Sequence, residues 1–545
     1  MLANYLKITF RNLWRYKFYT VINIIGLGIG IAAVVWAYQN YRFAFSYDNF
    51  HKDPDHIFRV MVFRENNNAV QGVCPVPVPV LAKQEFAGIG YAMRIDSRRA
   101  TIKAETSEAI SQNVNFADDG LLDVFNFPLV SGVADLSDPS AVLITEDMAA
   151  RLYGKSDPLG KTLIMYAGDS CQIGLEVKGV LKNLPKNTMM FFEVLTGWSN
   201  IRQFDCKPIA DDYWVWFVDG VFFKLNDPED APRLASYLNK YVEIQNAARP
   251  DWKITGFHVA SLPEVTRMSD VSANGFNERP EDSAAYGPLV LALLIFISAC
   301  LNFANTTVAR SSRRLREMGV RKVMGGTRNQ LMVQLLSECG VVVFLGILLS
   351  VVLNALWLPA YNRMWPYLEL QANYFSDNAL QLFLLFSLVG TTLLAGAYPA
   401  LYISRFNPTS IFRGTIRFGG TNLFSRILLG LQIAIALITV IASVSFARNA
   451  EFQKNYDFGY DRENLLIVDN TDPNTFTVME NAMRQNPKVL AMAGTRQHVG
   501  FNLATLVLEA EGQKTETRYM RVGDGYLELM GFELVTGRGF ATDQP

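Results

Sequence analysis

Residues 20–41 read TVINIIGLGIGIAAVVWAYQNY and contain no charged side chain. A helix of about 20 such residues spans the hydrocarbon core of a bilayer, so the segment predicts a transmembrane helix over residues 19–41. Its last turns carry aromatic rings, which favour the boundary between membrane and water. The segment offers no small-residue cleavage site, and we therefore expect it to remain as an anchor rather than act as a signal peptide.

Two glycines in this segment, Gly26 and Gly30, stand four residues apart. Small residues at this spacing let a second helix approach closely in a membrane, so both are predicted at helix-packing contacts. The letters GLGIG also resemble part of a nucleotide-binding loop. The full glycine fingerprint is missing, however, and the segment is predicted to lie in lipid, so packing is favoured over cofactor binding.

Half of the chain's residues are hydrophobic, and their distribution predicts more membrane helices. Four further segments are long and apolar enough to span a bilayer. Ahead of the first span, apolar residues recur at helical spacing between basic ones, which predicts an amphipathic interfacial helix over residues 1–18. The predicted spans cover residues 19–41, 288–308, 336–358, 380–402 and 427–446.

The connections between these spans alternate in charge. The start of the chain, residues 309–335 and residues 403–426 together hold fifteen lysines and arginines against one acid, Glu317. Basic connections stay on the cytoplasmic side. The N-terminus and both basic loops are therefore predicted to be cytoplasmic, in an inner membrane, with residues 42–285, 359–379 and 447–545 on the periplasmic side.

A sixteen-residue pattern occurs twice. Residues 117–132 read ADDGLLDVFNFPLVSG and residues 522–537 read VGDGYLELMGFELVTG, with seven identities. Each copy follows an apolar segment and a Tyr-Asp pair, at Tyr47 and at Tyr456. The repeat predicts a duplicated unit of one membrane helix and one polar domain. Because the second copy stops at Pro545, we expect residues 447–545 to be a partial domain.

Residues 42–285 are too many for a loop and predict an α+β domain. The apolar triplet 142–144 reads as a buried strand, Thr145 as an N-cap and Gly154 as a helix end. Alternating prolines at 75, 77 and 79 predict an extended linker, with a ligand groove as the alternative. Further predicted elements are a helix over 146–153 and strands over 162–165, 175–180 and 214–225.

The cysteines predict no disulfide framework. Cys300 and Cys339 fall in or near predicted membrane helices, which leaves Cys74, Cys171 and Cys206 outside. An odd number with irregular spacing allows one bridge among these three without identifying the pair.

Little in the chain points to catalysis. A GKT ending at residues 160–162 has five residues between its glycines where a phosphate-binding loop needs four, so ATP is not expected to bind this chain. His51 and His56, with Asp53 and Asp55 between them, favour a solvated turn over a metal site. Since no catalytic grouping stands out, we predict neither an enzyme nor a bound metal.

The basic loop at residues 310–328 reads RSSRRLREMGVRKVMGGTR. Leu315, Met318, Val320 and Val323 supply a small apolar face between charges. The paired glycines at 325 and 326 predict the helix end, and Thr327 is the candidate N-cap of the next helix. A short charged helix beneath the membrane is suited to docking on another protein; the alternative is an ordinary positive-inside loop.

At this point the chain resembles the MacB/FtsX family of ABC transporter permeases, in its double-length form with two fused units. The resemblance lies in four segments, of which the third and fourth are the more diagnostic: RNLWRYKFYTVINIIGLGIGIA (11–32); LITEDMAARLYGKSDPLGKTL (143–163) followed by EVKGVLKNLP (176–185); RRLREMGVRKVMGGT (313–327); and GAYPALYISRFNP (396–408).

The resemblance implies that ATP is bound by a partner ATPase, acting as a homodimer, and not by this chain. ATP-driven closure of the partner would move the helices and rearrange the outer domains, a mechanism called mechanotransmission, for export or efflux. A membrane-fusion or periplasmic adaptor protein is a further implied partner. An FtsX-like regulator of a cell-wall hydrolase is the alternative. The residues implied to contact the ATPase are Arg313, Arg316, Glu317, Met318, Gly319, Val320, Arg321 and Lys322.

Overall fold

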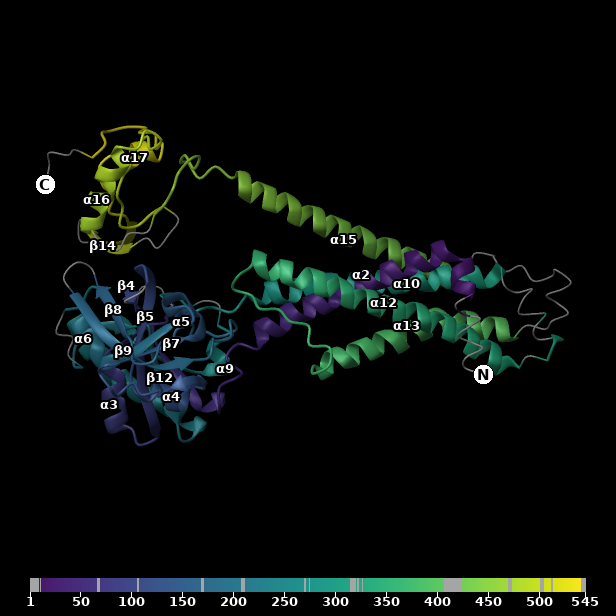
Figure 1. The fold of residues 1–545 in the computed structure, drawn as a ribbon, viewed down its shortest axis with the longest axis horizontal. Helices are drawn as coiled ribbons and strands as arrows, with labels where there is room; N and C mark the ends of the chain where they lie inside the picture. The colour runs from purple at the N-terminus through teal and green to yellow at the C-terminus, as the bar shows by residue number, and fades with distance from the viewer. Residues whose placement is uncertain are drawn as a thin grey trace. The chain divides into compact units, whose positions relative to one another are not determined.

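The computed structural model forms two compact units. One combines Met1–Tyr47 with Arg279–Asn455, and the other combines Asp48–Glu278 with Tyr456–Pro545. The first is built from long helices, and the second contains a large sheet with short helices (Figure 1). The structure describes residues 9, 11–65, 69–104, 107–167, 171–206, 211–268, 271–273, 275–313, 320, 323–325, 327–405, 423–468, 473–499, 504–510 and 513–540.

Five helices in the described part of the first unit are long and apolar enough to cross a membrane. Residues 11–15 are also helical and lead into the first of them. The last long helix, α15, packs on α10 through Leu301, Leu428 and Ile435. The five are α2 (Lys17–Phe45), α10 (Asp282–Arg313), α12 (Arg328–Met364), α13 (Asn378–Arg405) and α15 (Leu423–Asn455).

Glycines bring α2 close to two neighbouring helices. A Cβ added to Gly30 would lie 3.1 Å from the Cα of Phe296 in α10, so the two backbones touch there. One added to Gly28 would lie 2.7 Å from the side chain of Leu349 in α12. Gly26 has no atom of another described segment within 4 Å of its added Cβ. The close approach therefore uses Gly28 and Gly30, whereas the sequence predicts Gly26 and Gly30.

Among the long helices, α10 and α12 each contain a proline near one end. Pro288 lies six residues after the start of α10, and Pro359 lies five residues before the end of α12. Proline cannot donate the backbone hydrogen bond of a helix interior, so each helix lacks one bond at that point.

The described part of the second unit contains an eleven-stranded mixed sheet. Strands run β13-β1-β12-β4-β5-β10-β7-β9-β6, with β2 paired to β1 and β8 paired to β4 and β9. The strands are β1 (Ile57–Arg64), β2 (Val70–Gln71), β4 (Ile89–Ala104), β5 (Ile110–Ala117), β6 (Leu129–Gly132), β7 (Ala141–Thr145), β8 (Thr162–Ala167), β9 (Cys171–Leu181), β10 (Val194–Gly197), β12 (Gly220–Leu225) and β13 (Ile254–Ser261). A separate two-stranded pair joins β3 (Cys74–Pro75) to β11 (Phe217–Val218).

Both faces of this sheet are buried. Along β1, Phe58, Val60 and Val62 pack into one hydrophobic cluster, while Ile57 and Met61 pack into another. Side chains alternate between the two faces of a strand, so the sheet is sandwiched between two cores. The covering helices are α3 (Val78–Glu85), α4 (Leu121–Val124), α5 (Glu146–Tyr153), α6 (Ile201–Phe204), α7 (Ala231–Leu238), α8 (Val242–Ala248) and α9 (Leu262–Val265).

Several local predictions for this domain are confirmed. The strand predicted at 142–144 is β7, fully buried. Thr145 caps α5 by accepting a hydrogen bond from the Met148 N–H, and Gly154 ends that helix with a φ of 62°. The strands predicted at 162–165 and 175–180 lie within β8 and β9.

Three other local predictions are wrong. The proline-rich segment is not an extended linker: after β3, Pro77 caps α3 and Pro79 sits in its first turn, where a proline's missing N–H costs nothing. The predicted strand at 214–225 is interrupted and forms only β11 and β12. His51 is not solvated; its side chain is buried beside Phe125 and Phe127.

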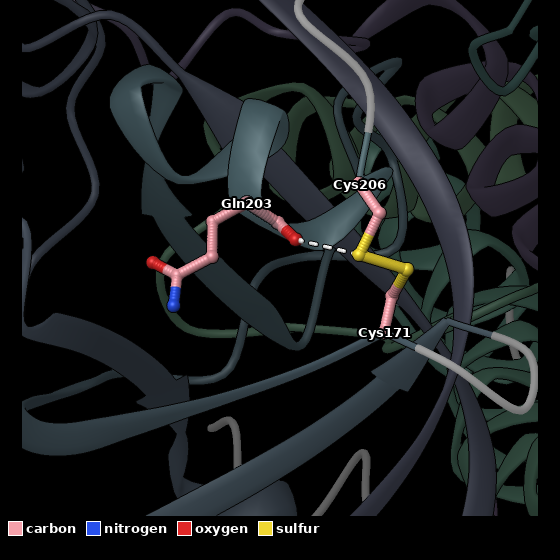
Figure 2. Close-up of a disulfide and its surroundings, with 3 residues drawn as sticks. All are labelled: Cys171, Gln203 and Cys206. Carbon is pink, nitrogen blue, oxygen red and sulfur yellow. Dashed lines mark hydrogen bonds between the residues drawn. A yellow bond between two sulfur atoms is a disulfide. The ribbon is translucent and has the colours of Figure 1, made fainter.

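One disulfide joins Cys171, the first residue of β9, to Cys206 after α6 (Figure 2). The Sγ of Cys206 lies 3.6 Å from the Gln203 carbonyl oxygen, a contact without a proton because a disulfide sulfur has none. Cys74, Cys300 and Cys339 are free and buried. The bridge resolves which two of the three outer cysteines pair.

The second copy of the repeat reproduces part of the first. In the first copy the Asn126 N–H donates to His51 Nδ1 at 3.1 Å; in the second, the Asp461 N–H donates to the Met530 carbonyl at 2.8 Å. In both, the segment after the Tyr-Asp pair contacts the segment after the Asp-Gly pair. The described elements of this copy are α16 (Pro473–Arg484), the hairpin β14 (Ala504–Ala510) and β15 (Gln513–Tyr519), and α17 (Tyr526–Leu529).

Replacing both bridged cysteines, as C171S/C206S, should destabilise the outer domain by about 4 kcal/mol. The bridge closes a loop across a sequence separation of 35, and loop-closure entropy in the unfolded chain gives that magnitude. Pulse proteolysis of the full chain in urea measures the effect. Reductant should shift wild type to the midpoint of the variant and leave the variant unchanged; equal midpoints for oxidised wild type and variant would contradict the prediction.

Gly30→Leu should destabilise the helical unit by about 1–3 kcal/mol, because the new side chain meets the backbone of α10. Gly26→Leu is the matched control and should cause no loss of stability, because no described segment lies within 4 Å of the added Cβ and leucine favours a helix more than glycine does. Unfolding by dodecyl sulfate in mixed micelles, followed by circular dichroism, compares the two. Equal losses would show that Gly26 also lies at a contact.

Candidate coupling site

The predicted docking loop lies between α10 and α12. Arg313 is the last residue of α10. Val320 is helical and half exposed, and Val323 and Met324 expose 63% and 83% of their surface. Exposed apolar side chains grouped in this way are typical of an interaction surface. Arg316, Glu317, Met318, Gly319, Arg321 and Lys322 lie outside the described residues.

The predicted docking loop ends where α12 begins, and two hydrogen bonds cap that helix. The Thr327 side chain accepts a hydrogen bond from the Gln330 N–H, and the Gln330 side chain accepts one from the Thr327 N–H. This reciprocal capping box satisfies two backbone donors at the start of the helix. The N-cap role predicted for Thr327 is therefore confirmed.

A polar cluster ties α12 to the segment ahead of α2. The Asn12 side-chain amide donates to Glu338 Oε1 at 2.8 Å, and the Gln334 amide, one turn earlier in α12, donates to the same oxygen at 3.3 Å. All three side chains are buried. A carboxylate inside an apolar helix is costly unless it is hydrogen-bonded, so this cluster holds the two segments together.

Sequence reasoning did not single out Glu338 as a functional residue. The sequence did carry a signal for Glu338, because this residue is a lone acid beside an apolar stretch. Its partner Asn12 could not be identified, since it lies more than three hundred residues away in the chain.

At the other end of α2, an ion pair joins it to α13. Arg42 pairs with Asp377, and the Tyr38 hydroxyl donates to the same carboxylate at 3.2 Å. Asp377 also accepts from the N–H groups of Ala379 and Leu380, which cap α13. The carboxylate is buried while Arg42 is half exposed. Together with the Glu338 cluster, this pair fastens α2 to its neighbours near both ends.

The outer domain contains buried charges of its own. Arg59 is fully buried and donates to the carbonyls of Gly72 at 2.6 Å and Asp219 at 3.1 Å; burial lowers its pKa to about 9. Asp96 pairs with Arg98 at 2.6 Å. Burial raises the pKa of Asp96 to about 7, although Arg98 acts in the opposite direction. These charges lie between strands of one sheet and form a structural network.

No group of three or more metal-binding side chains occurs among the described residues. The polar clusters at Glu338 and Asp377 instead join helices to one another.

Several solved structures are similar to part of the chain. The periplasmic region of MacB from Actinobacillus actinomycetemcomitans shares 13% identity with a TM-score of 0.29, and the match covers 38% of this chain and 90% of that one. The extracellular domain of the noncanonic ABC-type transporter YknZ from Gram-positive bacteria shares 16% identity with a TM-score of 0.27, over 37% and 100%. Among curated proteins, none matches the chain.

Two family models match the sequence. Residues 20–241 match the MacB-like periplasmic core domain, and residues 289–408 match the C-terminal domain of FtsX-like permeases. The first match covers most of α2 and most of the eleven-stranded sheet, and the second covers α12 and α13 with most of α10. These modules occur in the order expected from the four quoted motifs. The chain, a polytopic membrane protein with a large α+β periplasmic domain, therefore belongs to the MacB/FtsX family of ABC transporter permeases.

Proposed function

We propose that this chain is the permease subunit of an exporter or efflux system that works by mechanotransmission. A separate ATPase homodimer binds and hydrolyses ATP, docks on the loop between α10 and α12, and moves the periplasmic domain through the helices. No substrate passes through the bilayer between the helices in this mechanism. The solute is instead moved on the periplasmic side, where an adaptor protein receives it.

The observation that carries the proposal is the continuity of α10. This helix runs for 32 residues from Asp282 to Arg313, which corresponds to about 48 Å at helical rise. Its first residue follows the last residues of the sheet domain, and its last residue opens the docking loop. A displacement of the loop is therefore passed along one covalent, hydrogen-bonded rod to the domain.

The membrane topology follows from charge and chemistry. The basic loops are assigned to the cytoplasm of an inner membrane, with the N-terminus on the same side. The disulfide between Cys171 and Cys206 supports a periplasmic position for the sheet domain, because structural disulfides persist in oxidising compartments and are rare in the cytosol.

Replacing Met318 and Val320 by aspartate should abolish co-purification of the ATPase and leave membrane insertion intact. Two buried negative charges at an apolar contact cost several kcal/mol. Val130→Asp with Val133→Asp is the matched control, since both valines are exposed in the sheet domain, and it should retain the ATPase. Retention by the Met318/Val320 variant as well would refute the docking role of the loop.

A cysteine at position 161 should react with a membrane-impermeant maleimide in intact spheroplasts, and a cysteine at position 321 should react only after permeabilisation. Cys74, Cys300 and Cys339 are removed first, while the Cys171–Cys206 bridge is kept because it holds the labelled domain. Labelling of position 321 in intact spheroplasts would overturn the topology.

The FtsX-like alternative shares the docking loop and differs in what the outer domain binds. Recovery of a cell-wall hydrolase with the detergent-extracted complex supports the regulator. Recovery of an exported solute or an adaptor protein supports the exporter.

A further inference from the structure

The chain enters the outer domain at Asp48 and leaves it after Glu278, and both connections contact one short loop. The Asp48 N–H donates to the Asn187 carbonyl at 3.1 Å. The Asp48 carboxylate accepts from the Met189 N–H at 3.1 Å and from the Thr188 hydroxyl. On the leaving side, the Asn277 N–H donates to the Met189 carbonyl at 3.0 Å. Met189 thus bonds the entering connection with its N–H and the leaving connection with its carbonyl.

These contacts are buried, and they restrict the movement of the chain at Asp48 and Thr188. Asp48 and Thr188 are 1% and 0% exposed. The Thr188 oxygen also accepts from the Met190 N–H at 3.3 Å, so its hydroxyl proton remains available for Asp48. A buried carboxylate that loses a donor keeps the full cost of desolvation. Asp48 has a φ of 56°, in the left-handed region, so the chain turns sharply at the point where it is held.

Apolar packing joins the same two connections. Met189 and Met190 belong to one hydrophobic cluster, and Phe50 from the entering side and Phe276 from the leaving side both pack against it. Phe276 is also held on the sheet, with its ring centre 4.5 Å from the guanidinium of Arg59. Both polar and apolar contacts therefore converge on residues 187–190.

We propose that residues 187–190, called the yoke below, couple the entering and leaving connections so that α2 and α10 move the sheet domain together. The yoke lies between β9, which ends at Leu181, and β10, which begins at Val194. A displacement of either connection is thereby delivered to two strands of the sheet. Thr188 and Met189 are positioning residues in this role, which rests on the mechanotransmission proposed above.

A purely local role for each contact predicts something different. If Thr188 only stabilises the turn at Asp48, loss of its hydroxyl disturbs residues near Asp48 and not the leaving connection. Energetic coupling between two sites must be shown by perturbing one and measuring the other. The yoke therefore has a direct test in the exchange of the Asn277 amide, which Thr188 does not contact in the hydrogen bonds of the described residues.

The experiment compares Thr188→Val with Thr188→Ser in the full chain, reconstituted in nanodiscs, by hydrogen exchange of peptides that cover residues 46–52, 186–191 and 275–280. Valine matches threonine in shape and lacks the hydroxyl, whereas serine keeps it. We expect Thr188→Val to raise exchange about tenfold in all three peptides, as for one lost hydrogen bond, and Thr188→Ser to restore wild-type exchange. Thr162→Val removes an exposed hydroxyl of the same domain and should change none of them.

Asp48→Asn provides a second perturbation if valine at 188 prevents folding. The substitution removes the negative charge of residue 48 and keeps one side-chain acceptor oxygen. It should also raise hydrogen exchange in the peptide that covers residues 275–280. Faster exchange confined to 46–52 and 186–191 in both variants would overturn the yoke.

A second experiment distinguishes failure of the yoke from failure of the proposed function on which it rests. With the ATPase bound and trapped by a nucleotide analogue, wild type should change exchange at 46–52 and 275–280 together. In Thr188→Val the two peptides should respond independently, and a joint response there would overturn the yoke. If trapping changes neither peptide in wild type, mechanotransmission is refuted, while the first experiment still decides whether the two connections are coupled.

Discussion

The close approach of α2 and α10 at Gly30 is the contact on which the rest of the molecule depends. The backbones touch there, so the two helices whose ends connect to the outer domain are held side by side. A domain inserted between such helices needs its own ends to be neighbours. The outer domain meets this requirement, because Asp48 and Asn277 both bond to the loop at residues 187–189. The glycine contact thus keeps the two helices together in the predicted membrane region, and the yoke keeps the two connections together in the outer domain.

Short-range patterns predicted much of this fold. Apolar length alone identified five membrane helices, because a bilayer imposes a minimum span. Thr145 and Thr327 were predicted as N-caps, since a cap is decided by residues within one turn. In each of these cases the cause and its effect lie within a few residues of each other.

Features that depend on distant residues could not be predicted. The partner of Cys171 was ambiguous, because pairing depends on where α6 packs on β9. Gly28 was overlooked in favour of Gly26, since spacing along one helix does not reveal which face meets α12. The clusters at Glu338 and Asp377 pair residues more than three hundred positions apart. His51 is polar by type, and it is buried because Phe125 and Phe127 from another segment pack around it together with its neighbour Phe50.

The prolines in α10 and α12 have a mechanical consequence. Pro288 and Pro359 both stand at the end of their helix that is remote from the docking loop, and each removes one backbone bond there. The missing bond of each helix therefore lies within about two turns of its far end, and the length adjoining the loop contains no proline. Bending concentrates where the bond is missing, so a change in helix angle is largely absorbed at the proline. A shift along the helix axis meets no such joint, so the missing bonds weaken these helices against bending and not against a load along their axis.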